Sequence, residues 1–276
     1  MTKEIKFRIK YEGGDADQNR LELYDAGVSI HGIARALAIS MHAFLNNGSI
    51  RSRVEKIAGA KIYIHPSKQG SFEELIVIAI NSDIVSNIGL TVAANASWEF
   101  VKWSWAKATG QQVGELTSRH AKKILENNED LESDLSVALE KPLEQMHRPL
   151  ASNEDMKISI TRNKTNDSIF FDQTTFAYVE TTTESSLSRG ILGNVTRYNI
   201  LSGNGRFYDD TLERTISFGL DSEVSSQEKQ ILTWSMDQRN NGNDGKVIID
   251  ANRIVNKRHE TKRYVVVEVR KPENQR

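Results

Sequence analysis

Arginine and tyrosine recur between residues 194 and 215, and these are the side chains whose types and spacing best suit ligand chemistry. The run contains Arg197, Tyr198, Arg206, Tyr208 and Arg214. Tyrosine rings stack on nucleobases and arginine contacts phosphate, so a sheet face that carries both suits single-stranded nucleic acid or a nucleotide. Strand alternation places Arg197 and Tyr198 on opposite faces. The alternative is that these residues pair across strands and only stabilise the sheet.

A second basic cluster lies in residues 253–263, which are expected to form the tip of a hairpin. Lys257 and Arg258 lie near its centre, and Glu260 is the one acidic residue in the run. A phosphate group or an acidic partner would suit this cluster. The other interpretation is a solvated turn.

The sequence contains no recognisable motif for metal binding, cofactor binding or catalysis. Cysteine is absent, and the six histidines are scattered. His31 and His42 share one side of a predicted helix, but eleven residues of helix rise separate them by roughly 16 Å, too far to share a metal. Neither a glycine-rich phosphate loop nor a nucleophile elbow occurs. We therefore predict no cofactor, no metal site and no catalytic residue, although catalytic groups that converge from distant positions would escape this reasoning.

Charge is balanced over the chain, with 36 Lys+Arg against 37 Asp+Glu in 276 residues. Strong non-specific binding to DNA needs a basic field, so nucleic-acid binding here would depend on a local patch. The opening residues MTKEIKFRIK lack the apolar core of a signal peptide, and a cytoplasmic location is therefore expected.

The character of the sequence changes near residue 150, which predicts two domains. Residues 1–150 alternate short strands with long amphipathic helices, and the expected fold is an α+β domain. Residues 155–276 consist mostly of short β-runs separated by Gly, Asn and Asp clusters, which favours a small β-barrel of the OB or SH3-like kind. Residues 151–155 would be the linker.

In the first domain, residues 4–11 alternate apolar and charged side chains and predict a strand. Residues 20–24 alternate again, which indicates a hairpin. A helix is expected from Ser29 to Leu45, and residues 68–70 suit another hairpin turn. Residues 111–147 favour one or two polar helices.

Residues 84–108 form the most apolar long run and predict a helix. Polar side chains such as Glu99 and Lys102 interrupt it, so we expect no transmembrane span. A core helix, an oligomer interface and contact with a membrane surface are all compatible with the pattern. If it is an interface, its residues would be Trp98, Val101, Trp103 and Trp105.

The second domain is predicted to hold several strands and one helix. The helix covers residues 225–238, with Ser225 or Ser226 as its cap and Glu228 in its first turn. Residues 172–181 suit either a short helix or a strand. The expected strands are 156–160, 191–200, 204–208, 212–220, 246–254 and 262–270.

Several of these runs carry a resemblance that covers nearly the whole chain. Residues 21–26, 33–37, 70–73 and 98–103 resemble the N-terminal α+β domain of a family of uncharacterised bacterial proteins. The run from Gly193 to Tyr208 is similar to the C-terminal part of that family, a five-stranded β-barrel. The resemblance implies the two-domain fold and no activity. Some such bacterial proteins lie on mobile elements or in phage-defence loci.

Three functions follow as hypotheses. The first is a non-enzymatic binding or adaptor protein that associates with itself or with a protein partner. Such a protein could be a component of a phage-defence or mobile-element system. The second is a nucleic-acid-binding protein that uses the face with Arg197, Arg206 and Tyr208. The third is a nucleotide-responsive sensor. An enzyme ranks behind all three.

Overall fold

The computed structural model describes residues 2–51, 56–65, 73–81, 89–128, 130–162 and 165–272. The chain divides into two compact units, Met1–Val179 (unit 1) and Glu180–Arg276 (unit 2). Each unit encloses its own hydrophobic core. The hairpin turn predicted at 68–70 and the first residues of the helix predicted over 84–108 lie outside the described residues.

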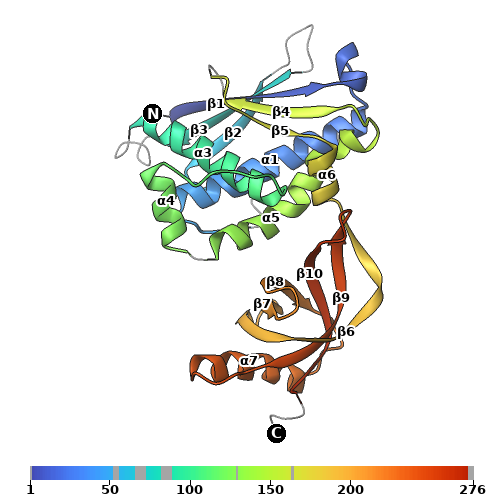
Figure 1. The fold of residues 1–276 in the computed structure, drawn as a ribbon. Coiled ribbons are helices and arrows are strands. Elements are labelled where there is room, and N and C mark those ends of the chain that lie inside the picture. The colour runs from blue at the N-terminus through green and yellow to red at the C-terminus, as the bar shows by residue number, and fades with distance from the viewer. Residues whose placement is uncertain are drawn as a thin grey trace. The chain divides into compact units, whose positions relative to one another are not determined.

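Unit 1 is built on an antiparallel sheet with the strand order β2-β3-β1-β4-β5 (Figure 1). Its strands are β1 (Thr2–Glu12), β2 (Ala60–His65), β3 (Glu73–Asn81), β4 (Lys157–Arg162) and β5 (Ser168–Phe171). The predicted alternation of β1 is confirmed, because Ile5, Phe7 and Ile9 are buried while Lys6 and Arg8 lie on the other face.

Helices cover one face of this sheet (Figure 1). They are α1 (Leu23–Leu45), α3 (Leu90–Ala108), α4 (Arg119–Glu126), α5 (Leu131–Met146) and α6 (Gln173–Val179). Helices α1 and α5 cross closely at Gly32. A Cβ atom at Gly32 would lie 2.5 Å from the backbone N of Met146 and from the backbone O of Pro142, so only glycine allows this approach.

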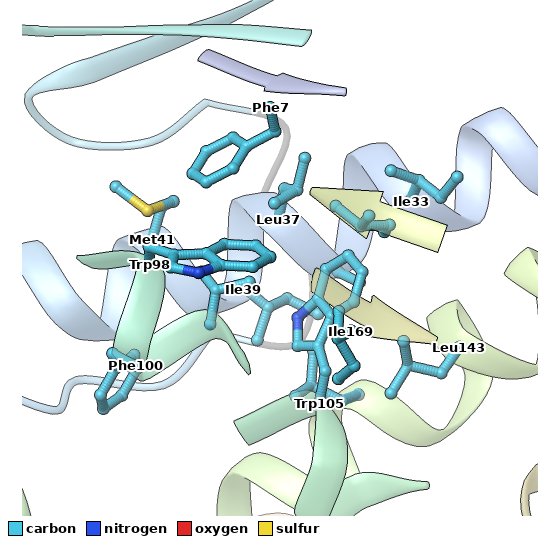
Figure 2. Packing of buried hydrophobic residues seen from close by; sticks show 14 of the residues in the cluster. Phe7, Ile33, Leu37, Ile39, Met41, Trp98, Phe100, Trp105, Leu143 and Ile169 are labelled. Carbon is cyan, nitrogen blue, oxygen red and sulfur yellow. The ribbon is translucent and has the colours of Figure 1, made fainter. Parts of the chain in front are cut away.

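The core of unit 1 lies between the sheet and the helices (Figure 2). Phe7 from β1 and Trp98 from α3 approach with ring centroids 5.3 Å apart. Trp105 is fully buried and donates its indole N–H to the Ser40 hydroxyl at 2.9 Å. A buried indole N–H needs a partner, and Ser40 on α1 supplies it.

The strand predicted at residues 20–24 is absent, because α1 already begins at Leu23. A carboxylate oxygen of Glu22 accepts a hydrogen bond from the Asp25 backbone N–H at 2.8 Å and caps the helix. Leu23 and Tyr24 are 85% and 67% exposed, so the apolar alternation here does not mark a buried face. A short 3-10 helix, Gly14–Gln18, joins β1 to α1.

The boundary between the units also differs from the predicted linker at 151–155. Strand β4 pairs with β1, β5 pairs with β4, and α6 follows directly, so residues 157–179 belong to unit 1. The short β-runs after residue 155 resemble barrel strands in composition, but two of them complete the first sheet. The ambiguous run at 172–181 contains the helix α6.

Unit 2 is a closed five-stranded barrel with the strand order β10-β8-β7-β6-β9, which confirms the small-barrel prediction. Its strands are β6 (Thr181–Tyr198), β7 (Asn204–Asp209), β8 (Arg214–Leu220), β9 (Val247–Asn256) and β10 (Thr261–Arg270). All the pairings are antiparallel except that of β8 with β10, which is parallel and closes the barrel.

Helix α7 (Ser226–Asn240) connects β8 to β9, and this position together with the strand order is the connectivity of an OB-fold. The predicted cap is confirmed, since the Ser225 hydroxyl accepts from the Glu228 N–H and Glu228 accepts from the Ser225 N–H at 2.8 Å. Glu228 also accepts from the Val269 N–H at 3.0 Å, which ties the start of α7 to β10.

Candidate functional site

The barrel strands divide their side chains between the core and an outer face. Phe207 on β7 and Ile216 on β8 lie opposite each other and fill the core. The neighbours of these two residues along each strand point outward, because side chains alternate along a strand. We call the outward positions of β7 and β8, together with the residues of β6 and β10 that pair with them, the barrel face. It comprises Asn194, Arg197, Asn204, Arg206, Tyr208, Thr215, Ser217, Gly219, Arg263 and Val265.

No Asp or Glu stands at these ten positions of the barrel face, while three of them are arginine. The β8 side chains of this face, Thr215, Ser217 and Gly219, are small, and Thr215 is exposed. Tyr208 is 37% exposed and lies opposite Thr215. The face therefore presents two exposed arginines, Arg197 and Arg263, and one accessible aromatic ring.

A β-bulge brings Arg197 onto this face. Val195 pairs with Phe207 and points into the core, but Arg197 pairs with Arg206 because the register shifts between them. In a regular strand, residues two apart share a face, so the extra residue, Thr196, turns Arg197 outward. Arg206 is only 6% exposed, which means that its side chain lies against the barrel surface.

Two of the predicted site residues lie elsewhere. Tyr198 stacks on Phe218, with ring centroids 6.3 Å apart and the planes 17° from parallel, and burial raises the pKa of its hydroxyl. Arg214 stands at the start of β8 and donates to the Thr261 carbonyl at 2.6 Å, joining β8 to β10. Tyr198 packs against the core of the barrel, whereas Arg214 is exposed at the start of β8, and neither residue lies on the barrel face.

The sequence patterns give no sign of a buried polar network that lies at the β7–β8 turn and is centred on Asp209. Tyr264 on β10 donates its hydroxyl to Asp209 at 2.6 Å. The other carboxylate oxygen of Asp209 accepts the Thr211 and Leu212 N–H groups at 2.8 and 3.0 Å. Burial, and then the hydrogen bond and charge of Asp209, raise the pKa of Tyr264. This network fixes the turn beside the barrel face.

The basic hairpin tip is where the sequence placed it, in the turn between β9 and β10. Lys257 and Arg258 are both exposed. The Lys257 ammonium pairs with Glu180 at 2.6 Å, and the Arg258 backbone N–H donates to the Asn256 side chain at 2.9 Å. Glu180 thus offsets part of the charge that the sequence assigned to this tip.

A hollow of about 860 Å³ lies beside Tyr208. Asn194 and Thr196 of β6 form one wall, and the C-terminal end of α7 forms another with Arg239. Lys246 also lines the hollow, and Asp210 holds its ammonium with both carboxylate oxygens at 2.7 Å. The barrel face therefore continues from Tyr208 into a recess whose lining includes basic and amide side chains and the acidic side chain of Asp237.

The four residues proposed for an interface are in the core of unit 1. Trp98, Val101, Trp103 and Trp105 are 2%, 0%, 4% and 0% exposed. They lie on the part of α3 that packs into the core of unit 1, against the sheet and the other helices (Figure 2). A partner cannot reach these side chains in the folded chain, so of the three interpretations the core helix fits the structure.

Two further features of the structure concern metal binding and membrane spans. Within the described ranges, no three or more His, Asp and Glu side chains are grouped so that they could hold a metal ion. By length and composition alone, the described helix Leu23–Leu45 would also suit a membrane span, and most of its apolar stretch is buried inside unit 1.

Comparisons with known proteins identify family models whose function is unknown. Residues 7–180 match the family model DUF7946, a domain of unknown function, and residues 188–270 match DUF7947, a family of unknown function. No curated protein matches the chain, and no solved structure does. The two matches follow the two units seen in the fold. Because the first model covers more than half of the residues, the chain belongs to the DUF7946 family, and its barrel matches DUF7947.

Proposed function

We propose that this chain binds single-stranded nucleic acid on the barrel face of unit 2. The observation that carries the proposal is the composition of that face: the exposed side chains of Arg197, Arg263 and Tyr208 and no acidic side chain, in a chain whose net charge is −1. A cationic sheet surface with an aromatic ring suits a strand whose phosphates and unstacked bases are both accessible.

Each group on the face has a role in this proposal. Arg197 and Arg263 are exposed and would contact phosphates. Tyr208 would stack on one base, and the hollow next to it would receive the neighbouring nucleotide. Duplex DNA would bind less well, because its bases are paired and cannot reach the ring.

The OB connectivity agrees with this assignment, since OB-folds use the face of their second and third strands for oligonucleotides and oligosaccharides. Those strands correspond to β7 and β8 here. The agreement is an analogy of fold, and the charge and the exposed ring on this particular face are what favour nucleic acid. The interface suggested for the adaptor hypothesis consisted of the α3 side chains Trp98, Val101, Trp103 and Trp105, and these are buried; self-association remains a prediction for other surfaces.

The test is fluorescence anisotropy of a labelled single-stranded oligonucleotide, about twelve nucleotides long, with the full chain at several salt concentrations. Binding should weaken steeply as salt rises. Tyr208→Ala should reduce the affinity about tenfold, because stacking on one ring is worth roughly 1–3 kcal/mol. Arg263→Ala should also reduce the affinity and should lessen its dependence on salt, because it removes a phosphate contact. Lys229→Ala removes an exposed charge from α7 and should leave the affinity unchanged.

Melting temperatures of the variants show whether unit 2 stays folded. Affinity that survives both barrel-face substitutions, or that Lys229→Ala lowers equally, would show that the site assignment is wrong. Absence of any salt-dependent binding to single-stranded DNA and RNA would refute the function itself.

A further inference from the structure

Strand β2 lies at one edge of the unit 1 sheet and pairs with β3. A hollow of about 970 Å³ lies beside it, between β2 and α1. Residues 60–64 of β2 all line the hollow, although alternate side chains of a strand point to opposite faces. The hollow therefore follows the backbone of the strand as well as its side chains.

The walls of the hollow are apolar and are kept apart by small residues. Helix α1 contributes Ile30, Ala34 and Ala38, which lie on one side of the helix because they are four residues apart. The inner face of β2 contributes Ala60 and Ile64 opposite them. Ile64 is 51% exposed and Ala34 is exposed, so the apolar surface is open to solvent.

The charge around the hollow is mostly positive. Arg35, Lys56 and Lys61 line it, and Glu74 is the one acidic residue among its described lining. Glu74 is 8% exposed and sits deep on the inner face of the sheet, opposite Ile9. A ligand that reaches the rim from solvent therefore meets cations.

We propose that an extended peptide segment of another protein binds along β2 as an added strand. Edge strands offer their backbone groups for this kind of pairing, and pockets for alternate side chains give it specificity. The peptide would place apolar side chains in the hollow, at every second position, and acidic side chains near Lys56 and Lys61. A second copy of this chain fits less well, because pairing β2 with β2 would bring the same cations together.

This interaction concerns unit 1 and does not depend on nucleic-acid binding by the barrel. The probe is a phage-displayed library of random eight-residue peptides, selected on the immobilised full chain. Selection on Ala34→Trp runs in parallel, because the indole would fill the hollow from an exposed helix position. Enriched peptides should alternate apolar residues with polar ones and contain Asp or Glu.

A synthetic peptide of the enriched consensus then measures the affinity. The double variant Lys56→Glu, Lys61→Glu should weaken binding about tenfold or more, since it reverses the charge that attracts the peptide. Lys157→Glu is the matched control, because Lys157 is exposed on β4 of the same sheet. Amide hydrogen exchange should show slower exchange in residues 60–64 when the peptide is bound.

The competing occupants give distinct results. If no peptide is enriched on the native chain relative to Ala34→Trp, the peptide proposal is wrong. Enrichment without protection of residues 60–64 would refute strand addition. A concentration-dependent dimer that Ala34→Trp abolishes would assign the groove to a second copy instead. Melting curves of each variant separate these outcomes from unfolding.

Discussion

His147 is an imidazole enclosed within unit 1, with 0% of its surface exposed. Its Nδ1 lies 2.6 Å from the Leu143 carbonyl, which can only accept, so Nδ1 carries the proton. Its Nε2 lies 2.9 Å from the Thr175 hydroxyl and accepts from it. Burial lowers the pKa of His147 from 6.5 to about 4, so the ring is neutral in the folded chain near neutral pH.

This residue predicts a loss of stability in mild acid. Between pH 6.5 and about 4 the unfolded chain binds a proton at His147 that the folded chain does not bind, so the free energy of unfolding falls as pH falls through this window. The difference in pKa corresponds to about 3 kcal/mol at the lower end.

Urea unfolding at a series of pH values checks this prediction. His147→Leu should flatten the dependence between pH 6.5 and 4, and His31→Gln, at an exposed histidine, should keep the native dependence. Parallel curves for the native chain and His147→Leu would contradict it.

Single residues of the barrel face were only partly predictable from the sequence. Alternation correctly separates Tyr198 from Arg197. The bulge that separates Val195 from Arg197 leaves no mark in the sequence, because Thr196 is compatible with a regular strand. Asp209 also looks like any turn acid until β10 brings Tyr264 to it. Contacts between distant strands decide these positions, and local patterns do not contain them.

At the scale of elements, the crossing of α1 and α5 makes a paired prediction about two glycines of one helix. Gly32→Ala should lower the free energy of unfolding by about 1–3 kcal/mol, because the new methyl group meets the backbone of α5. Gly27→Ala should raise it by about 0.5–1 kcal/mol, because nothing lies within 4 Å and alanine favours the helix.

Urea unfolding of the full chain, followed by a signal from unit 1, measures both effects. The two substitutions add the same atoms to the same helix, so opposite signs can arise only from their surroundings. Equal effects of the two substitutions would mean that α1 and α5 do not approach at Gly32.

Elements with a regular internal pattern were predictable. The alternation in β1 and the capping residues of α7 gave these elements nearly their observed bounds. Residues 20–24 were misassigned because five alternating residues are too few to distinguish a strand from the first turn of a helix. The cap at Glu22 uses a glutamate, which is not among the residues that usually mark a helix start.

At the scale of the whole molecule, the position of the boundary predicts which fragments fold. A fragment of residues 1–179 should fold, because it contains all five strands of the first sheet. A fragment of residues 1–150 should not, because it lacks β4 and β5 and exposes β1 along one edge. It also loses Asp167, which accepts from the Trp98 indole at 2.6 Å.

Dispersed amide signals in an NMR spectrum and a sharp melting transition would identify a folded fragment. If residues 1–150 gave both and residues 1–179 gave neither, the boundary would lie where the composition changes rather than where the pairing of strands ends.

The parallel pairing of β8 with β10 also affects how the chain folds while it is being synthesised. Unit 1 has every strand it needs once residue 179 has left the ribosome, and domains generally fold in the order of their synthesis. The barrel must wait, because β10 comes after its four other strands and closes it. During that delay β8 has an open edge, and a nascent chain with an open edge is vulnerable to pairing with its neighbours. If translation stalls between β8 and β10, the released chain would therefore have a folded unit 1 and an incomplete, aggregation-prone unit 2.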